Sequence, residues 1–110
     1  MESRPAYLVA ELTVRDISKL LEYAAKVQPL MARYGGRIVA ITQGSTRVIE
    51  GDWRPDLVVV HRWDDAERFD RFWASAEYAP LKDLRHEACE SRIVMVDAFA
   101  PGPAAETSDV

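Results

Sequence analysis

The chain has few of the residues that build metal centres or disulfide frameworks. Its 110 residues include a single cysteine, Cys89, and two histidines, His61 and His86. A lone cysteine cannot close an intramolecular disulfide, and two histidines are too few for a protein-only zinc site of the usual kind. We therefore expect neither a structural disulfide nor a metal site.

Long apolar runs and an excess of basic residues are also missing. No stretch approaches the roughly 18 consecutive apolar residues that span a membrane, and residues 1–16 lack a basic region followed by an apolar segment. The net charge is −4 with acids and bases interleaved, so no basic stripe could follow a phosphate backbone. These absences predict a cytoplasmic protein whose partners include neither a membrane nor a nucleic acid.

Nucleotide-binding and hydrolytic motifs are absent as well. The sequence contains no P-loop, no dinucleotide glycine fingerprint after its first predicted strand, no HExxH and no GxSxG. Their absence argues against phosphate-driven and hydrolytic chemistry, and we expect no tightly bound cofactor.

What the chain does contain is the composition and length of one globular domain. Hydrophobic residues make up 48% and charged residues 29% of the chain, which is typical of globular proteins, and half of its length would be too short for a stable core. We predict a flexible N-terminus over residues 1–5 and one domain over residues 6–99. Residues 100–110 are rich in proline, alanine and small polar residues, which predicts a disordered tail.

The domain begins with a predicted strand and a predicted helix. Residues 7–15 alternate, and one face of this strand is wholly apolar: Leu8, Ala10, Leu12 and Val14. Asp16 can cap the helix that follows, Gly35 marks its end, and Pro29 inside it predicts a bend or break. The apolar stripe of this helix, which we expect to be core, comprises Ile17, Leu20, Leu21, Ala24, Val27, Leu30, Met31 and Tyr34.

The rest of the domain predicts further strands, two short helices and a final strand. Residues 37–42 and 46–50 flank a turn and predict either a pair of strands or a bulged extension of one hairpin, and the next strand is expected at residues 56–63. Two helices should follow, one capped by Asp64 or Asp65 and the other starting near Pro80. The last strand is expected at residues 92–99.

This order of elements predicts an α+β fold. Two split βαβ units give a ferredoxin-like domain, in which helices cover one face of a four-stranded antiparallel sheet. The opposite face still carries apolar residues such as Val9, so another surface must cover it. We therefore expect a homodimer packed sheet to sheet.

Four sequence pieces resemble one known family. They are AYLVAELTVRD at 6–16, YGGR at 34–37, VIEGDWRP at 48–55 and FWASAEYAPLKDLRHEA at 72–88. In their order and spacing, the chain resembles the domain-of-unknown-function family 1330 of the dimeric α/β-barrel superfamily. The resemblance implies a ferredoxin-like homodimer whose two sheets close into a barrel.

The resemblance does not choose a reaction, since a fold alone does not imply a function. The superfamily includes cofactor-independent monooxygenases acting on polyphenols, haem-degrading enzymes, muconolactone-type isomerases and proteins without assigned chemistry. One departure concerns charge: similar sequences often carry Arg-Gly-Gly where this chain has Ile41-Thr42-Gln43-Gly44. A cation at the end of the second strand is therefore missing, which weakens an anionic-substrate hypothesis drawn from the family.

His61 is the candidate catalytic base. It lies on the predicted strand 56–63 and shares a face with Leu57, Val59 and Trp63. An imidazole at the mouth of an apolar cleft suits proton abstraction from an activated carbon or a phenol. The alternative is a partly buried histidine that is hydrogen-bonded to a neighbour.

Four further residues are candidates for substrate binding, each with a structural alternative. Glu50 either faces the cleft or fixes its turn through backbone hydrogen bonds. Trp53 either stacks on a ligand or covers the dimer seam. Tyr78 and Arg85 either bind a carboxylate or phenolate, or dock a short helix onto the sheet.

Glu11 and Arg37 complete the candidate binding residues. If both point from the helix-free face, they can form a polar pair within a cavity, because a buried unpaired charge is costly. His86 and Cys89 are spaced to meet on one helix face. A Cys–His nucleophile is not favoured, since neither an orienting residue nor an oxyanion donor accompanies them.

Together these features predict a small homodimeric protein that binds or transforms an aromatic or carbonyl-containing metabolite. The expected reaction classes are isomerisation, cyclisation and cofactor-independent monooxygenation. The alternative is a non-catalytic, ligand-binding or stress-associated dimer, in which the same polar residues only satisfy the fold.

Overall fold

The computed structural model describes residues 4–97. Residues 1–3 and 98–110 lie outside this range, and with them the predicted tail and most of the predicted flexible N-terminus. The elements follow in the order β1 (Ala6–Val14), α1 (Ile17–Arg33), β2 (Gly36–Ile41), β3 (Leu57–Trp63), α2 (Ala66–Trp73), α3 (Ala79–Ala88) and β4 (Cys89–Asp97). Among the helices in this range, none is both long and apolar enough to cross a membrane.

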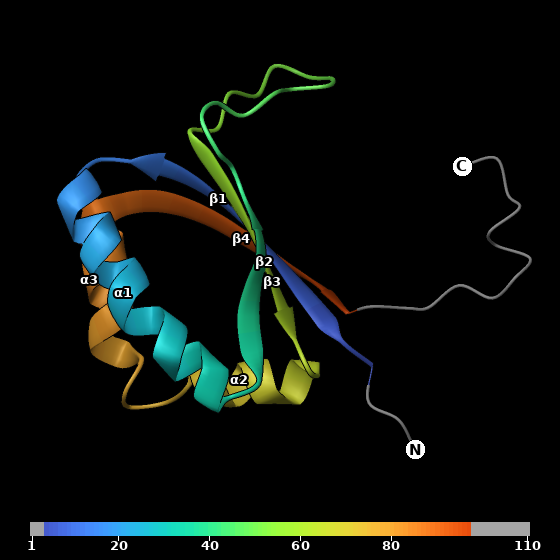
Figure 1. The fold of residues 1–110 in the computed structure, drawn as a ribbon, viewed down its shortest axis with the longest axis vertical. Helices are drawn as coiled ribbons and strands as arrows, with labels where there is room; N and C mark the ends of the chain where they lie inside the picture. The colour runs from blue at the N-terminus through green and yellow to red at the C-terminus, as the bar shows by residue number, and fades with distance from the viewer. Residues whose placement is uncertain (1–3, 98–110) are drawn as a thin grey trace, which may run out of the picture.

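The strands form one antiparallel sheet in the order β2-β3-β1-β4. Figure 1 shows α1 and α3 side by side on one side of this sheet, with α2 at its lower end. This arrangement confirms the predicted ferredoxin-like fold, with a four-stranded sheet and a helix-free face.

The alternation predicted for β1 sets the two faces of the sheet. Its buried side chains, which point toward the helices, are Ala6, Leu8, Ala10 and Leu12. Leu8 lies opposite His61 on β3 and Met95 on β4, so these three side chains share the helix-facing side. The core therefore lies between the sheet and the helices.

Helix α1 begins and ends as the sequence predicts, but it is not broken. The Asp16 carboxylate accepts a hydrogen bond from the Lys19 backbone N–H at 3.2 Å, and Gly35 adopts φ 87° after the last turn. The helix continues through Pro29, so of the predicted bend or break the break does not occur. Pro29 and Ala25 are both exposed, so water can hydrogen-bond to the carbonyl that lacks a helical partner.

Two strand predictions need correction. Residues 46–50 form no strand, because β2 pairs directly with β3 and residues 42–56 make the long connection between them. The Thr42 backbone N–H donates to the Val58 carbonyl at 2.9 Å, so β3 already occupies the edge that the shorter segment would need. Strand β4 starts at Cys89, three positions earlier than predicted, because it follows α3 without a loop.

Close packing explains the second glycine of the Gly35–Gly36 pair. A Cβ atom on Gly36 would lie 2.6 Å from the indole ring of Trp63, which is fully buried. The Trp63 ring also packs on Phe72, with the ring centroids 4.8 Å apart. The glycine thus lets the edge strand approach the aromatic core.

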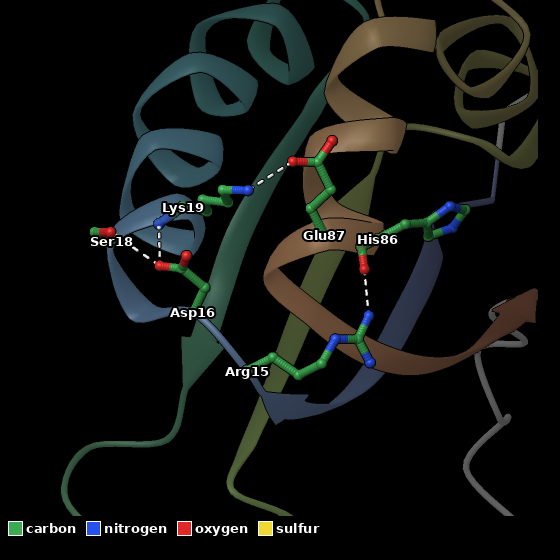
Figure 2. A network of polar contacts seen from close by, with 6 residues as sticks. All are labelled: Arg15, Asp16, Ser18, Lys19, His86 and Glu87. Carbon is green, nitrogen blue, oxygen red and sulfur yellow. Dashed lines mark hydrogen bonds and ion pairs between the residues drawn. The ribbon is translucent and has the colours of Figure 1, made fainter.

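A polar clamp ties the start of α1 to the end of α3 (Figure 2). The Ala88 carbonyl accepts hydrogen bonds from the backbone N–H groups of Arg15 and Asp16, at 2.8 and 2.9 Å. The Arg15 guanidinium donates to the carbonyls of His86 and Cys89, and Lys19 pairs with Glu87 at 2.8 Å. This clamp fixes α1 and α3 beside each other at one end of the core.

Candidate functional site

A cavity of about 240 Å³ lies between the sheet and the helices. Its walls come from β1, β2, β3, β4 and all three helices, and most of the lining side chains are apolar. The polar residues in its lining are His61, Tyr23, Tyr78 and Arg85. Such an apolar space with a few convergent polar groups is the usual form of a small-molecule site.

The cavity opens beside the first turns of α1. Ile17 and Leu21 line it, yet they are 60% and 63% exposed, whereas Leu20 between them is buried. The prediction that the whole apolar stripe is core is therefore wrong for these two residues. Their exposure shows that the apolar lining of the cavity reaches the molecular surface beside the first turns of α1.

His61 lies on β3 within the cavity wall. Its Nδ1 atom is buried and has no hydrogen-bond partner among residues 4–97, and its ring lies 6.3 Å from that of Trp63 between centroids. Burial lowers the pKa of His61 to about 4, because the charged imidazolium is poorly solvated there. The ring is thus neutral near pH 7, and no described residue hydrogen-bonds to its Nδ1, unlike the hydrogen-bonded alternative.

Two tyrosines and Arg85 form a second polar group in the cavity lining. The hydroxyls of Tyr23 and Tyr78 lie 3.0 Å apart, and the Arg85 Nε–H donates to the Tyr78 oxygen at 3.3 Å. Arg85 also donates to the Ser91 hydroxyl. Burial raises the pKa of Tyr23 far above its ordinary value, so this phenol stays protonated.

This phenol pair can donate a hydrogen bond to a ligand. The Tyr23–Tyr78 contact uses one of the two hydroxyl hydrogens, and Arg85 supplies its own hydrogen. One phenolic hydrogen therefore has no partner within the group. A developing negative charge on a ligand oxygen would suit this donor.

Sequence reasoning missed Tyr23. Its position three residues after Leu20 and four before Val27 places it on the buried face of α1, and this spacing is visible in the sequence. The hydroxyl partner Tyr78 lies 55 positions away, so the pairing depends on how α1 and α3 pack.

The candidate residues in the long connection 42–56 lie away from the cavity. Glu50 is exposed, and its carboxylate makes no hydrogen bond to any described residue, so neither of its predicted alternatives is seen. Trp53 is 47% exposed and lines a shallow pocket of about 170 Å³ together with Glu11, Thr13 and Arg92. This pocket lies on the helix-free face, away from His61.

The predicted Glu11–Arg37 pair is wrong. Glu11 instead pairs with Arg92 across β1 and β4, with the charged atoms 3.5 Å apart. Arg37 lies on β2 opposite Arg62, and β3 separates β2 from β1. The strand order therefore keeps Glu11 and Arg37 apart, although both point from the helix-free face.

Cys89 and His86 do not form a nucleophile pair. Cys89 is buried, and its thiol donates to the Arg85 carbonyl at 3.5 Å; burial raises its pKa, which disfavours the reactive thiolate. His86 is exposed, and Figure 2 shows its side chain on the side of α3 that faces away from α1. Among residues 4–97, no group of three or more histidine, cysteine or acidic side chains could hold a metal ion.

Solved structures share this fold at low sequence identity. A protein of unknown function from Rhodopseudomonas palustris, RPA0582, superposes with a TM-score of 0.74 at 18% identity, over 91% of this chain and 86% of its own. SnoaB, a cofactor-independent oxygenase from Streptomyces nogalater, gives 0.66 at 20% identity, over 92% and 99%. A dimeric ferredoxin-like protein of unknown function from Jannaschia sp. CCS1 gives 0.67 at 14% identity, over 86% and 99%.

At these identities the structures establish the fold and not the reaction. Comparison with curated protein sequences finds no match. The sequence does match one family profile, described as Domain of unknown function (DUF1330), over residues 5–99. This match covers most of the chain and agrees with the fold and the sequence pieces, so the chain belongs to the DUF1330 family.

Proposed function

We propose that this chain binds and transforms a small aromatic or carbonyl-containing metabolite in the cavity between its sheet and helices. The reaction is a proton-transfer, isomerisation or oxygenation step without a tightly bound cofactor. His61 is the base, and the hydroxyls of Tyr23 and Tyr78 orient the ligand's oxygen. The functional unit is a homodimer.

The observation that carries this proposal is the unpartnered imidazole in an apolar cavity. A buried polar nitrogen without a hydrogen-bond partner costs free energy. Such a nitrogen is therefore expected where a bound ligand supplies the missing hydrogen bond. A ligand hydroxyl, or an acidic C–H bond beside a carbonyl, can supply the missing proton donor. Transfer of this proton to His61 leaves a substrate anion.

The Tyr23–Tyr78 pair supports the same proton transfer by stabilising the substrate's oxygen. An enolate or phenolate oxygen gains negative charge as the proton leaves, and a preorganised hydroxyl donor stabilises that charge best in a site that excludes water. The substrate anion can then take up a proton at another atom or react with dioxygen. The fold shared with SnoaB, itself a cofactor-independent oxygenase, supports the second course.

The helix-free face supports the dimer. Its side chains include Tyr7, Val9, Val94 and Val96 in adjacent positions on β1 and β4, and Val94 and Val96 are 60% and 53% exposed. An apolar patch of this kind on a sheet face is expected to be covered by another surface. A second copy is the simplest cover, and the Jannaschia relative of the same fold is described as dimeric.

A catalytic screen tests the proposal. Purified protein is incubated in air with aromatic ketones, quinols and lactones, and products are followed by mass spectrometry together with oxygen consumption. We expect turnover that falls by about 100-fold or more in His61→Ala, because a general base contributes about that much. Arg71→Ala, at an exposed α2 residue that lines neither the cavity nor its surroundings at Arg85, should retain the wild-type rate.

Turnover that survives His61→Ala unchanged would show that His61 is not the base. A second candidate function, binding without chemistry, is favoured by one observation: an imidazole with a pKa of about 4 is a weak base near pH 7. Compounds that bind the cavity and are recovered unchanged would support this second function instead.

A further inference from the structure

A second hollow adjoins the cavity and meets it at Arg85. This open groove has a volume of about 600 Å³ and lies between α3 and β4. The groove and the cavity share five lining residues, namely Leu8, Phe69, Trp73, Arg85 and Ile93. A ligand seated in the cavity could therefore extend into the groove past the Arg85 side chain.

Arg85 carries a buried positive charge without an acidic partner. The residue is 5% exposed, and no carboxylate within residues 4–97 lies within ion-pair distance of its guanidinium. Within residues 4–97, its side-chain hydrogen bonds go to neutral groups, the hydroxyls of Tyr78 and Ser91. Because an isolated buried charge is costly, this guanidinium is suited to an anion that comes with the ligand.

The groove wall beside Arg85 is also basic. Lys82 and His86 line it, and Arg15 does too, although the Arg15 guanidinium is engaged with backbone carbonyls. Glu90 is the acidic residue in this lining. A positive groove is notable because the chain as a whole carries a net charge of −4.

Trp73 presents an aromatic surface at the same place. The Lys82 ammonium lies 4.6 Å from the Trp73 ring centroid, and the Arg85 guanidinium carbon lies 5.7 Å from it. Lys82, like Arg85, has no carboxylate within ion-pair distance among the described residues. Two cations are thus held around one ring at the junction of cavity and groove.

We propose that the ligand carries a carboxylate, which binds Arg85 and Lys82 at this junction while its apolar body fills the cavity. The inference rests on the proposed function, since it names the substrate class of the same cavity. Arg85 is then a specificity-determining residue, because its planar guanidinium can hold a carboxylate with paired hydrogen bonds.

Two matched probes test this inference. We propose to measure the binding of 2-naphthoate and of 2-naphthamide by titration calorimetry near neutral pH and at low salt. The probes have nearly the same shape and differ in charge. We expect 2-naphthoate to bind the wild-type protein at least about tenfold more tightly, as a charge-assisted contact predicts.

Substitutions at Arg85 and Lys82 then test which residues bind the carboxylate. Arg85→Gln should remove most of the preference for 2-naphthoate and leave the affinity for 2-naphthamide nearly unchanged. Lys82→Gln, at a side chain that is not fully buried, should reduce the preference by a smaller factor. It tests the same contact if Arg85→Gln does not fold. Arg71→Gln is the matched control, because Arg71 is an exposed α2 residue outside both spaces.

The outcomes separate the two proposals. Equal affinity of the wild-type protein for both probes would overturn the carboxylate inference and leave the cavity proposal standing. Binding of neither probe would overturn the inference together with the proposed function. A preference for 2-naphthoate that persists in folded Arg85→Gln and Lys82→Gln would place the anion elsewhere and overturn the inference.

Discussion

At the scale of single residues, burial decides what His61 can do. The ring is neutral near pH 7 because the folded protein lowers its pKa to about 4, below the ordinary 6.5. It can therefore accept a hydrogen bond from a ligand without first losing a proton. This neutrality costs stability in acid, since the unfolded chain takes up a proton more readily than the folded one.

The first prediction follows from that difference. The folding stability linked to His61 is fully present above about pH 6.5 and is lost as the pH falls toward about 4, where it levels off. The loss is at most about 3 kcal/mol. Urea unfolding at about pH 7 and about pH 5 should therefore show a smaller acid loss in His61→Gln than in the wild type.

His86→Gln is the control for this measurement, because His86 is exposed. It should show the same acid loss as the wild type. An equal loss in wild type and His61→Gln would mean that the imidazole is solvated, and the account of a dry cavity would be wrong.

The candidate site was predictable only where the sequence fixes the direction of a side chain. The alternation of β3 predicted that His61 shares a face with Leu57 and Val59, and all three line the cavity, as do Tyr78 and Arg85. Glu50 and Trp53 belong to the long connection 42–56, where no periodicity indicates direction. Their placement depends on the path of the loop and not on local pattern.

At the scale of elements, local signals predicted the helices and most strands. Asp16 caps α1 and Asp65 caps α2, and both caps are visible as acidic residues before an apolar period. The missed features are non-local: strand 46–50 was wrong because β3 pairs with β2, and the Glu11–Arg37 pair was wrong because β3 lies between the two strands. Pairing partners cannot be read from one segment alone.

The second prediction concerns the clamp between α1 and α3. Asp16→Ala should lower the free energy of unfolding, because it removes the side-chain cap from the Lys19 backbone N–H. Glu87→Gln should lower it by less, since the Lys19–Glu87 pair is largely exposed and such pairs contribute little. Denaturant unfolding of both variants measures these two losses of stability and checks which is larger.

A reversed order would contradict this account of the clamp. It would mean that the exposed Lys19–Glu87 pair between the helices contributes more stability than the side-chain cap at the start of α1. Ser18→Ala is a useful companion, because Ser18 donates only to the Asp16 carboxylate and leaves the cap itself in place.

At the scale of the whole molecule, the two faces of the sheet have different roles. The helix-facing side holds the cavity and its polar groups, whereas the helix-free side exposes apolar residues on β4. The sequence predicted this division from the alternation in β1, because one face was wholly apolar and the other mixed. The alternation did not identify the surface that covers the second face.

The third prediction tests that surface. Chromatography with light scattering should give a dimer mass for the wild type at micromolar concentration. Val94→Lys should give a monomer, because it places a charge within the apolar helix-free face. Ala25→Lys, on an exposed position of α1, should remain dimeric.

A monomeric wild-type protein would contradict the predicted sheet-to-sheet homodimer. A dimer that survives Val94→Lys and is lost in Ala25→Lys would place the interface on the helices instead. In the second case the cavity proposal would need to be re-examined with the helices, and not the sheet, as the shared surface.

The central claim is that ligands enter the cavity between sheet and helices, and the chain's three tryptophans can test it directly. Trp73 lines the cavity, whereas Trp53 lines the pocket on the helix-free face. The measurement is a titration of the ¹⁵N-labelled protein with uncharged 2-naphthol, following the indole N–H signals. A saturable shift of the Trp73 signal with Trp53 unmoved is the predicted result, and a saturable shift of Trp53 with Trp73 unmoved would contradict it.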